Sequence, residues 1–353
     1  MLDPKLKSFI EHIPKAELHC HLEGAIQPST LLKLAERNKI KLPFSDVAGA
    51  EKFYEFTNLN QFLEIFDLAC STLKTAEDFE TITLELGADA FRQNIAYREV
   101  FFTYAYHERR GIAWNEVVNG IAAGSKKAYQ QYGVEMRFIA DLDRTIEPND
   151  GIRTVEMAYT SRNIANIIGI GLDSQEIGFP AKRHAAAFQR AKELGFHRVA
   201  HAGEDVGPES VWDALTSLDV ERIDHGVRSI EDPKLVELVA KRRIPLTVCP
   251  LSNICLKVYT NMATHPIKRL MDAGVLVTLN SDDPPMFHSN VLDNYFGVAE
   301  TFDLDIDGVV ELARNSFLAS FLSTNEKNRY LKNFDESVSK LKASIFETKG
   351  GGN

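Results

Sequence analysis

The spacing of apolar and polar residues changes several times along the chain, and each change marks a predicted element. Residues 4–11 have the period of an amphipathic helix, and a short apolar run around Leu18 follows them. From residue 28 to residue 93 the period is helical throughout, with aromatic residues clustered between Phe53 and Phe66. The pattern therefore predicts a helical insertion at about 28–93, whose aromatic residues belong either to a lid over a substrate or to the core.

Beyond residue 95 the pattern becomes regular, because short runs rich in β-branched and aromatic residues alternate with helical stretches. With the run around Leu18 as the first, eight strands are predicted, and the other seven cover residues 96–104, 135–141, 167–172, 198–202, 222–225, 245–249 and 275–281. Repeated βα alternation favours a parallel sheet, and eight units favour a closed barrel. An open doubly wound sheet is the alternative, although no Gly-x-Gly-x-x-Gly motif follows an early strand.

Helical periodicity from Ile306 to Ile345 closes the chain. The predicted fold is therefore α/β, a (β/α)8 TIM barrel with a helical insertion after strand 1 and C-terminal helices. One domain is expected over residues 1–348, and the glycine-rich segment 349–353 is expected to be a disordered tail.

The composition is that of a globular enzyme with a large core, since 44% of the 353 residues are hydrophobic and 25% are charged. A net charge of −10 argues against nucleic acid and acidic membranes as partners, because both are bound through Lys and Arg. No apolar run is long enough to cross a bilayer, and the first residues lack a secretory apolar stretch. Four scattered cysteines fit a reducing cytoplasm, where we expect the protein to reside. The oligomeric state is left open.

Two histidines, His19 and His21, stand two positions apart in the first predicted strand. In an extended strand residues i and i+2 share a face, so both imidazoles point the same way while Cys20 points the other way. Neutral imidazole is a common zinc ligand, but two such histidines are also compatible with ordinary hydrogen bonding. The meaning of the pair thus depends on what the other strands supply.

Further ionisable residues fall at the C-terminal ends of later predicted strands: His201, His225 and the pair Asp282 and Asp283, with Glu204 shortly after His201. In a βα barrel these ends form the active site. Three imidazoles and one carboxylate suit Zn²⁺, with Fe²⁺ or Mn²⁺ as alternatives, and a metal-bound water gives hydroxide near neutral pH. Glu204 is expected to act as an acid toward the substrate, and His225 to take a proton from the water or orient it.

Four segments, 14–25, 201–204, 224–226 and 280–284, together resemble the adenosine/adenine deaminase family of metal-dependent amidohydrolases. The likeness runs from about Ile13 to about Leu322, and the motifs are highly specific in this order. It implies a (β/α)8 barrel that holds one Zn²⁺ per chain and removes the amino group of a 6-aminopurine, a small-molecule substrate. The metal ligands that the resemblance implies are His19, His21, His201 and Asp282. It also implies that Glu204 protonates purine N1, that His225 orients and deprotonates the attacking water, and that Asp283 engages purine N7.

The segment Gly171 to Gly178 bears on which aminopurine is used. It has Ser174 where adenosine deaminases have a glycine that approaches purine N3, and in this respect it resembles the adenine deaminase branch. We expect Ser174 and Glu176 to contact the N3/N9 edge of a free base, because a carboxylate there rejects a ribose. Gly171 and Glu23 are further candidates for substrate contacts, although Glu23, where many adenosine deaminases have an Asp that holds the ribose, does not decide between the substrates.

Other segments depart from that branch. Pro284 to Ser289 is closer to nucleoside-acting relatives, and Tyr104 to Gly111 lacks the Ser-His-Thr element of adenine enzymes, with His107 expected at the surface. Adenine deamination, giving hypoxanthine and ammonia, is therefore favoured over deamination of adenosine or another N9-substituted adenine. Hydrolysis of an amide, ester or phosphotriester is a further alternative, but no lysine stands at the end of strand 4 to bridge two metals. A non-catalytic metal-binding role does not explain Glu204 and His225.

Overall fold

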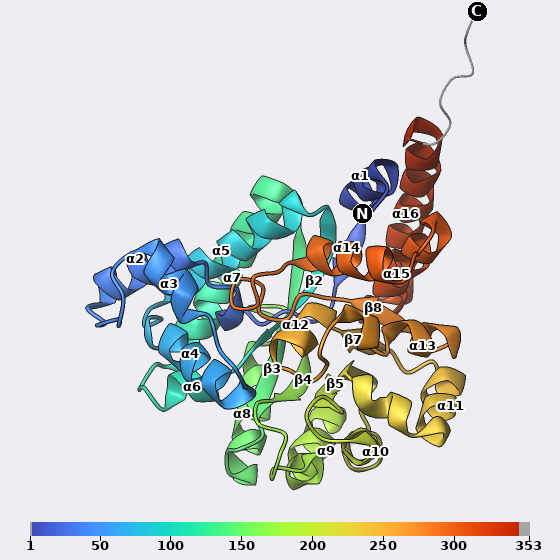
Figure 1. The fold of residues 1–353 in the computed structure, drawn as a ribbon. Helices are drawn as coiled ribbons and strands as arrows, with labels where there is room; N and C mark the ends of the chain where they lie inside the picture. The colour runs from blue at the N-terminus through green and yellow to red at the C-terminus, as the bar shows by residue number, and fades with distance from the viewer. Residues whose placement is uncertain (1, 346–353) are drawn as a thin grey trace, which may run out of the picture.

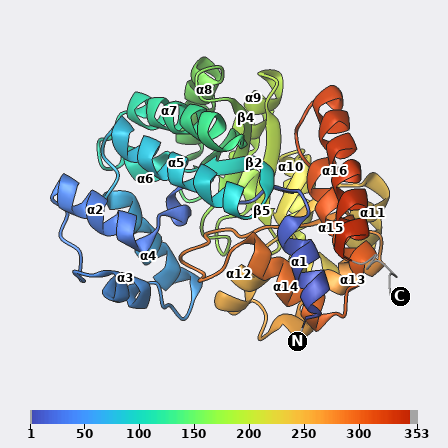
Figure 2. The ribbon, with the colours of Figure 1, turned by 90° about the horizontal axis from the view of Figure 1, so that it is seen from above.

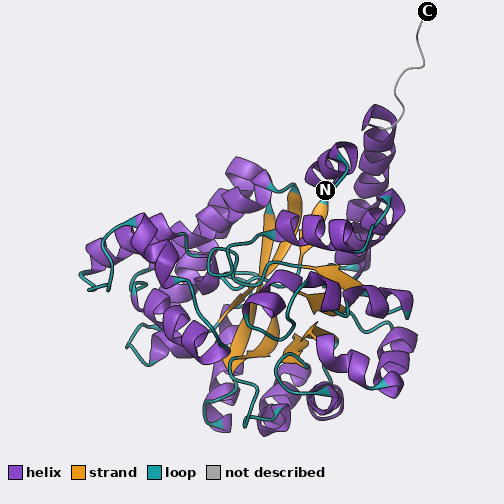
Figure 3. Ribbon diagram, in the orientation of Figure 1, coloured by secondary structure: helices purple, strands orange, loops and turns teal. Residues whose placement is uncertain are grey.

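The structure, a computed structural model, describes residues 2–345. Eight parallel strands form one sheet in sequence order, inside a ring of helices (Figures 1 and 3). The strands are β1 (Lys15–Glu17), β2 (Ile95–Phe102), β3 (Glu135–Asp143), β4 (Ile167–Asp173), β5 (His197–Ala202), β6 (Arg222–His225), β7 (Leu246–Val248) and β8 (Val277–Leu279). This arrangement confirms the predicted (β/α)8 barrel. The expected tail at 349–353 lies outside the described residues.

The helices between and after the strands follow the predicted order. Those of the barrel ring and the C-terminus are α6 (Ala105–Glu108), α7 (Trp114–Tyr132), α8 (Pro148–Ser161), α9 (Ala185–Glu193), α10 (Pro208–Ser217), α11 (Pro233–Arg242), α12 (Pro250–Cys255), α13 (Ile267–Asp272), α14 (Val291–Thr301), α15 (Ile306–Leu318) and α16 (Thr324–Ile345). The N-terminal helix α1 (Pro4–His12) packs against α14, α15 and α16. None of the helices in residues 2–345 combines the length and apolarity that a membrane span requires.

The barrel closes beyond the ends of β1 and β8. A single parallel bridge joins Cys20 to Asp282, in which His21 N–H donates to the Asp282 carbonyl (3.0 Å) and Asp282 N–H to the His19 carbonyl (3.1 Å). Below it, Leu18 N–H donates to the Asn280 side chain (2.9 Å). His19 and His21 therefore lie in an extension of β1 rather than inside the strand itself, which ends earlier than expected. The closure holds the two segments that carry three of the four predicted ligands.

The helical insertion contains α2 (Pro28–Asn38), α3 (Val47–Phe53), α4 (Leu59–Ser71) and α5 (Ala76–Arg92). Only the first three project from the barrel, at the left of Figures 1 and 2, whereas α5 lies side by side with α7. Glycines permit this close approach, since a Cβ on Gly87 would overlap Ala128 and one on Gly124 would overlap Thr83. Because α5 leads directly into β2, it is the first helix of the barrel ring, and the insertion proper ends near residue 71.

Candidate active site

Four buried side chains meet at the C-terminal end of the barrel. Nitrogen and oxygen atoms of His19, His21, His201 and Asp282 all lie within 4.8 Å of one another. His21 Nε2 lies 3.1 Å from His201 Nε2 and 3.4 Å from Asp282 Oδ1, and His19 Nε2 lies 3.2 Å from the same Oδ1. The four predicted metal ligands are thus brought together, from the segment after β1, from β5 and from the segment after β8.

Hydrogen bonds to Nδ1 of His201 and His19 determine which nitrogen of each ring faces the ligand cluster. His201 Nδ1 lies 3.1 Å from the Leu172 carbonyl, which only accepts, so Nδ1 carries the hydrogen. His19 Nδ1 contacts the Thr247 hydroxyl (3.1 Å), whose own hydrogen is donated to Asp224 Oδ1 (2.7 Å), so this Nδ1 donates as well. In the neutral form of both rings the lone pair is therefore on Nε2, and the buried His19 Nε2 has no hydrogen-bond partner among the described residues.

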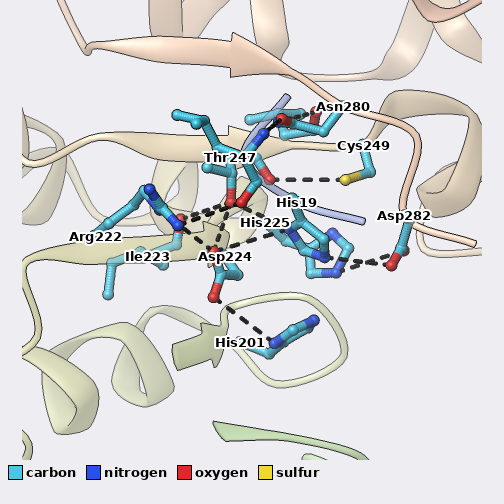
Figure 4. A network of polar contacts seen from close by, with 12 residues as sticks. His19, His201, Arg222, Ile223, Asp224, His225, Thr247, Cys249, Asn280 and Asp282 are labelled. Atoms are coloured by element: carbon cyan, nitrogen blue, oxygen red, sulfur yellow. Dashed lines mark hydrogen bonds and ion pairs between the residues drawn. The ribbon is translucent and has the colours of Figure 1, made fainter. Parts of the chain in front are cut away.

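Neighbouring polar groups orient these ligand residues. Asp224 lies between two of the rings, with 3.9 Å from its Oδ1 to His19 Nδ1 and from its Oδ2 to His201 Nδ1 (Figure 4). Ser252 donates to Asp282 Oδ2 (2.6 Å), which leaves Oδ1 directed at the histidines. Such outer contacts fix ring and carboxylate orientation at metal sites. The sequence offered no direct signal for Ser252.

One aromatic side chain packs against all three histidines of the ligand cluster. Phe101, at the end of β2, packs edge-on against His19 (5.2 Å between ring centroids) and at tilted angles against His21 (5.1 Å) and His201 (5.6 Å). It forms a small apolar cluster with Ile139 and Val199. This residue too was not identified from the sequence, where it reads as ordinary strand core.

The donor set and its surroundings fit a single divalent metal ion. Burial lowers the pKa of His21 to about 4, and burial together with His19 lowers the pKa of His201 well below its usual range, so both rings are neutral at pH 7. Burial acts on His19 too, but the Asp282 and Asp224 carboxylates outweigh it and raise the pKa of this ring. Three imidazoles and a carboxylate form a ligand set suited to Zn²⁺. The unpartnered Nε2 of His19 is the kind of buried atom that a bound cation would satisfy.

Glu204 and His225 lie beside this cluster and share one neighbour. Asn253 Nδ2 is 3.2 Å from Glu204 Oε1 and 3.2 Å from His225 Nδ1, and it donates to both. The amide orientation is set by His265, whose Nδ1 accepts from Ile267 N–H (3.2 Å) and whose Nε2–H donates to Asn253 Oδ1 (3.2 Å). In this arrangement neutral His225 carries its hydrogen on Nε2, which faces Glu204 Oε1 at 3.5 Å.

Burial sets the protonation of these two groups. It raises the pKa of Glu204 well above its usual range, with the nearby carboxylates of Asp205 and Asp282 acting in the same direction. Burial and His19 lower the pKa of His225 to about 3. A carboxyl that keeps its proton next to an imidazole that stays neutral is an arrangement suited to acid catalysis.

Asp283 is buried at the wall of the same cavity, and its Oδ1 has no hydrogen-bond partner among the described residues. Burial and the adjacent Asp282 raise the pKa of this carboxyl well above its usual range. Gly24 lies directly behind it, where any Cβ would overlap the Asp283 carboxylate. Gly24, in the segment 14–25, thus leaves room for the side chain of Asp283, in the segment 280–284.

A cavity lies over the ligand cluster, and helix α4 of the insertion lines one side of it. Leu59, Phe62, Leu63 and Phe66 of α4 line it together with Phe287 from the loop after β8. Phe62 stacks on Phe287, with 4.9 Å between ring centroids and 25° between the planes. Phe62 and Phe66 thus line the cavity and also belong to the hydrophobic core, and whether the insertion acts as a lid stays a prediction.

The position of Glu176 differs from the expected one. Its carboxylate accepts hydrogen bonds from the backbone N–H groups of Gly203 (2.8 Å), Glu204 (3.2 Å), Asp205 (2.9 Å) and Val206 (2.8 Å), and from the Ser210 hydroxyl. Both oxygens are therefore turned toward the loop after β5, and Glu176 is not among the described residues that line the cavity. Glu176 holds the loop that carries Glu204, and the expected contact with the N3/N9 edge is corrected accordingly.

Of the other residues predicted to contact the substrate, one lines the cavity and two do not. Ser174 lines the cavity as expected. Gly171 lies within β4, where a Cβ would overlap the Asp141 carboxylate, so it serves packing. Glu23 is buried, accepts from Thr103 N–H (3.2 Å) and pairs with His107 Nε2 (2.9 Å), and it is not among the described residues lining the cavity. His107 is fully buried by this pair, so its expected surface position was wrong.

Comparisons with known proteins agree with this geometry. A family model described as adenosine deaminase matches residues 14–337. The chain is 42% identical over 334 residues to an adenine deaminase of Cupriavidus necator, covering 95% of each chain. Among solved structures it is similar to an adenine deaminase from Arthrobacter aurescens (TM-score 0.89, 36% identity, 93% of this chain and 99% of that one). An amidohydrolase from Burkholderia ambifaria, solved with bound Zn, shares the fold (TM-score 0.91, 23% identity, 99% and 96% covered).

Proposed function

Because the chain belongs to the adenosine deaminase family, we propose that it hydrolyses the 6-amino group of adenine, releasing hypoxanthine and ammonia. The observation that carries the proposal is the largely buried Glu204 carboxyl, which lines a cavity together with three of the four predicted metal ligands. The choice of adenine rests on relatives that are named adenine deaminases and match nearly the whole chain at 42% and 43% identity.

His19, His21, His201 and Asp282 are proposed to hold one Zn²⁺. When bound, the ion supplies a Lewis acid that lowers the pKa of a water molecule and makes it a nucleophile at neutral pH. The same residues, with Phe101 beneath them, define the place toward which C6 of the purine must point.

Glu204 is proposed to protonate purine N1. Its raised pKa keeps the carboxyl protonated at neutral pH, and the hydrogen bond from Asn253 to Oε1 holds it in place. As water adds to C6, negative charge would otherwise build up on N1. A proton from Glu204 neutralises this charge in the transition state, where it accelerates the reaction.

His225 and Asp283 are proposed to orient the reactants. With Nδ1 accepting from Asn253, His225 presents an Nε2–H that donates to the oxygen of the attacking water. This supports the orienting part of its expected role, whereas uptake of a proton at Nε2 requires the other tautomer. Asp283, protonated through its raised pKa, donates to N7, which is an acceptor in adenine. Contacts at N1 and N7 together fix the ring with C6 toward the ligand cluster.

The location proposed for this reaction is the cytoplasm. All four cysteines are free thiols, three of them buried, as in a protein kept in a reducing compartment.

The test is ammonia release from adenine and from adenosine by the zinc-loaded protein. We expect adenine to be the better substrate by kcat/KM, and we expect Glu204→Gln to lower kcat on adenine by about 100-fold or more while retaining zinc. Glu209→Gln, an exposed glutamate of α10, is the matched control and should retain full activity. Ammonia release from the nucleoside alone, or full turnover by Glu204→Gln, would contradict the proposal.

A further inference from the structure

A second cavity adjoins the one over the ligand cluster and shares a wall with it. This outer cleft is lined by Glu64, Asp67, Arg109, Asp143, Thr145 and Gln175. Leu63, Tyr106 and Ser174 line both cavities. Tyr106 comes from α6 after β2, and Ser174 directly follows β4; their hydroxyl oxygens are 3.2 Å apart. The Tyr106–Ser174 hydrogen bond thus spans two βα loops and separates the two spaces.

The direction of this hydrogen bond follows from its neighbours. Asp173 accepts from the Thr103 hydroxyl through Oδ2 and from the Ser174 hydroxyl through Oδ1 (3.2 Å). When Asp173 is ionised, the single hydrogen of Ser174 is used in this way and Tyr106 donates to Ser174 Oγ; burial and Asp143 raise the pKa of Asp173 to about 7, so this direction holds above that pH. The Ser174 oxygen keeps one free acceptor position, and the Tyr106 oxygen keeps acceptor capacity as well. We call the Tyr106–Ser174 pair the wall. Both of its hydroxyl hydrogens are used within the protein, so the wall offers hydrogen-bond acceptors to the cavity.

The remaining edge of the purine fits these acceptors. With C6 toward the ligand cluster and contacts at N1 and N7, the N3/N9 edge is left to other residues. Among the described residues lining the cavity, the polar ones apart from the catalytic and ligand residues are Tyr106, Asp173 and Ser174. Free adenine carries a hydrogen on N9 that an acceptor can receive, whereas a nucleoside carries a ribose carbon there.

From this juxtaposition we propose that the Tyr106–Ser174 pair restricts the substrate to purines without an N9 substituent. This inference rests on the proposed deaminase function and deepens it. The pair accepts the N9 hydrogen of the free base and stands where a substituent would have to pass into the outer cleft. A substituted purine loses the hydrogen bond and collides with the wall, so both effects act against it.

The wall is built to resist displacement. The Tyr106 ring packs edge-on against Phe66 (5.1 Å between ring centroids) and lies under the Arg109 guanidinium (4.2 Å), which is itself paired with Asp67. Ser174 has a left-handed backbone conformation with φ of 69°, which a side chain adopts only at a cost. Keeping a serine in this position, where glycine is favoured, is consistent with a function for its hydroxyl.

The charge of the outer cleft limits what an opened wall would admit. Of the charged residues described there, Glu64, Asp67 and Asp143 are acidic, and the basic Arg109 is already paired with Asp67. A phosphate group would meet net negative charge. We therefore expect an opened variant to accept a neutral N9 substituent and to reject a nucleotide.

The experiment compares adenine, 9-methyladenine, adenosine and AMP on the zinc-loaded enzyme. Wild-type protein should use adenine and discriminate against 9-methyladenine. The double variant Tyr106→Ala with Ser174→Gly should raise kcat/KM for 9-methyladenine and adenosine, relative to adenine, by about 100-fold, without using AMP. Tyr106→Phe keeps the wall and removes one hydroxyl, so it should lower kcat/KM for adenine by about threefold to tenfold. Tyr104→Phe, whose hydroxyl bonds to the Ile112 carbonyl instead (2.9 Å), is the matched control and should change neither value.

The outcomes separate this inference from the proposed function. A wild-type enzyme that fails on adenine overturns the function itself. A wild-type enzyme that uses adenine and 9-methyladenine equally well overturns the role of the wall. So does a folded, zinc-containing double variant that keeps adenine turnover and gains nothing on the substituted purines. Should the double variant not fold, Ser174→Gly alone provides the test with 9-methyladenine, because glycine suits the backbone at this position.

Discussion

Adjacent residues of one short segment have opposite roles at the metal site. His19 and His21 direct nitrogens into the ligand cluster, whereas Cys20 between them is buried and belongs to the hydrophobic core. We expect His21→Ala to lose bound zinc and to lower kcat/KM by about 1000-fold or more, because the Lewis acid is worth several kcal/mol. Cys20→Ala, the matched control, should retain both. The measurements are metal content by mass spectrometry and ammonia release, and zinc retained by His21→Ala at full occupancy would contradict the assignment.

Asn253 positions two catalytic groups at once, through its hydrogen bonds to Glu204 and His225. Replacing it with leucine removes both contacts and leaves the metal ligands untouched. We expect kcat to fall by about 100-fold with little change in KM and full zinc content, since orientation contributes to the chemical step. Asn333→Leu, at an exposed position of α16, is the control. A rise in KM with unchanged kcat would show that Asn253 acts on binding instead.

At this scale the sequence predicted the residues whose chemistry is distinctive and missed those that act by position. The ligand residues and Glu204 stand at strand ends, which a barrel brings together whatever the loops do. Glu176 was assigned to the substrate because spacing does not reveal that four consecutive N–H groups after β5 converge on its carboxylate. Asn253 lies shortly after the seventh predicted strand, and no pattern indicated its contact with His265.

Among the elements, α4 lines one side of the cavity, and the Phe62–Phe287 stack joins it to the loop after β8. We expect Phe62→Leu, which keeps most of the buried volume, to raise KM for adenine by about tenfold through loss of ring contact with the base. Phe53→Leu is the matched control, because Phe53 of α3 packs on Phe44 within the same insertion and not on the cavity. Steady-state kinetics of both variants test this, and equal effects would indicate general loosening of the insertion.

The elements were predictable where hydrophobic spacing alone determines them. Strands β4, β5 and β6 begin and end within one residue of their predicted bounds. The predicted helical segment at about 28–93 agrees with α2 to α5, which lie between β1 and β2, but periodicity does not show that α5 packs on α7 in the ring. Strand β8 is shorter than its apolar run, since the chain beyond Leu279 is held by side-chain hydrogen bonds and one isolated bridge.

For the whole molecule, the number of βα units predicted the barrel, but not how it closes. Closure depends on the bridge between Cys20 and Asp282 and on the Asn280 side chain, which are specific contacts that periodicity cannot show. The ligand residues adjoin these contacts, so the metal site and the seam of the barrel occupy the same place.

Metal removal should therefore destabilise the whole fold and not only the activity. Without a cation, the buried His19 Nε2 has no hydrogen-bond partner among the described residues, and a bound ion would give it one in common with the neighbouring His21 Nε2 and His201 Nε2, which are 3.1 Å apart. An ion present at about 1000 times its Kd stabilises the folded state by about 4 kcal/mol, which corresponds to about 5 °C in Tm for a chain of this length. We expect a chelator to lower Tm by about that amount and zinc to restore it. His21→Ala should unfold at a temperature that neither treatment changes; an equal response to chelator in that variant would place the stabilising ion elsewhere.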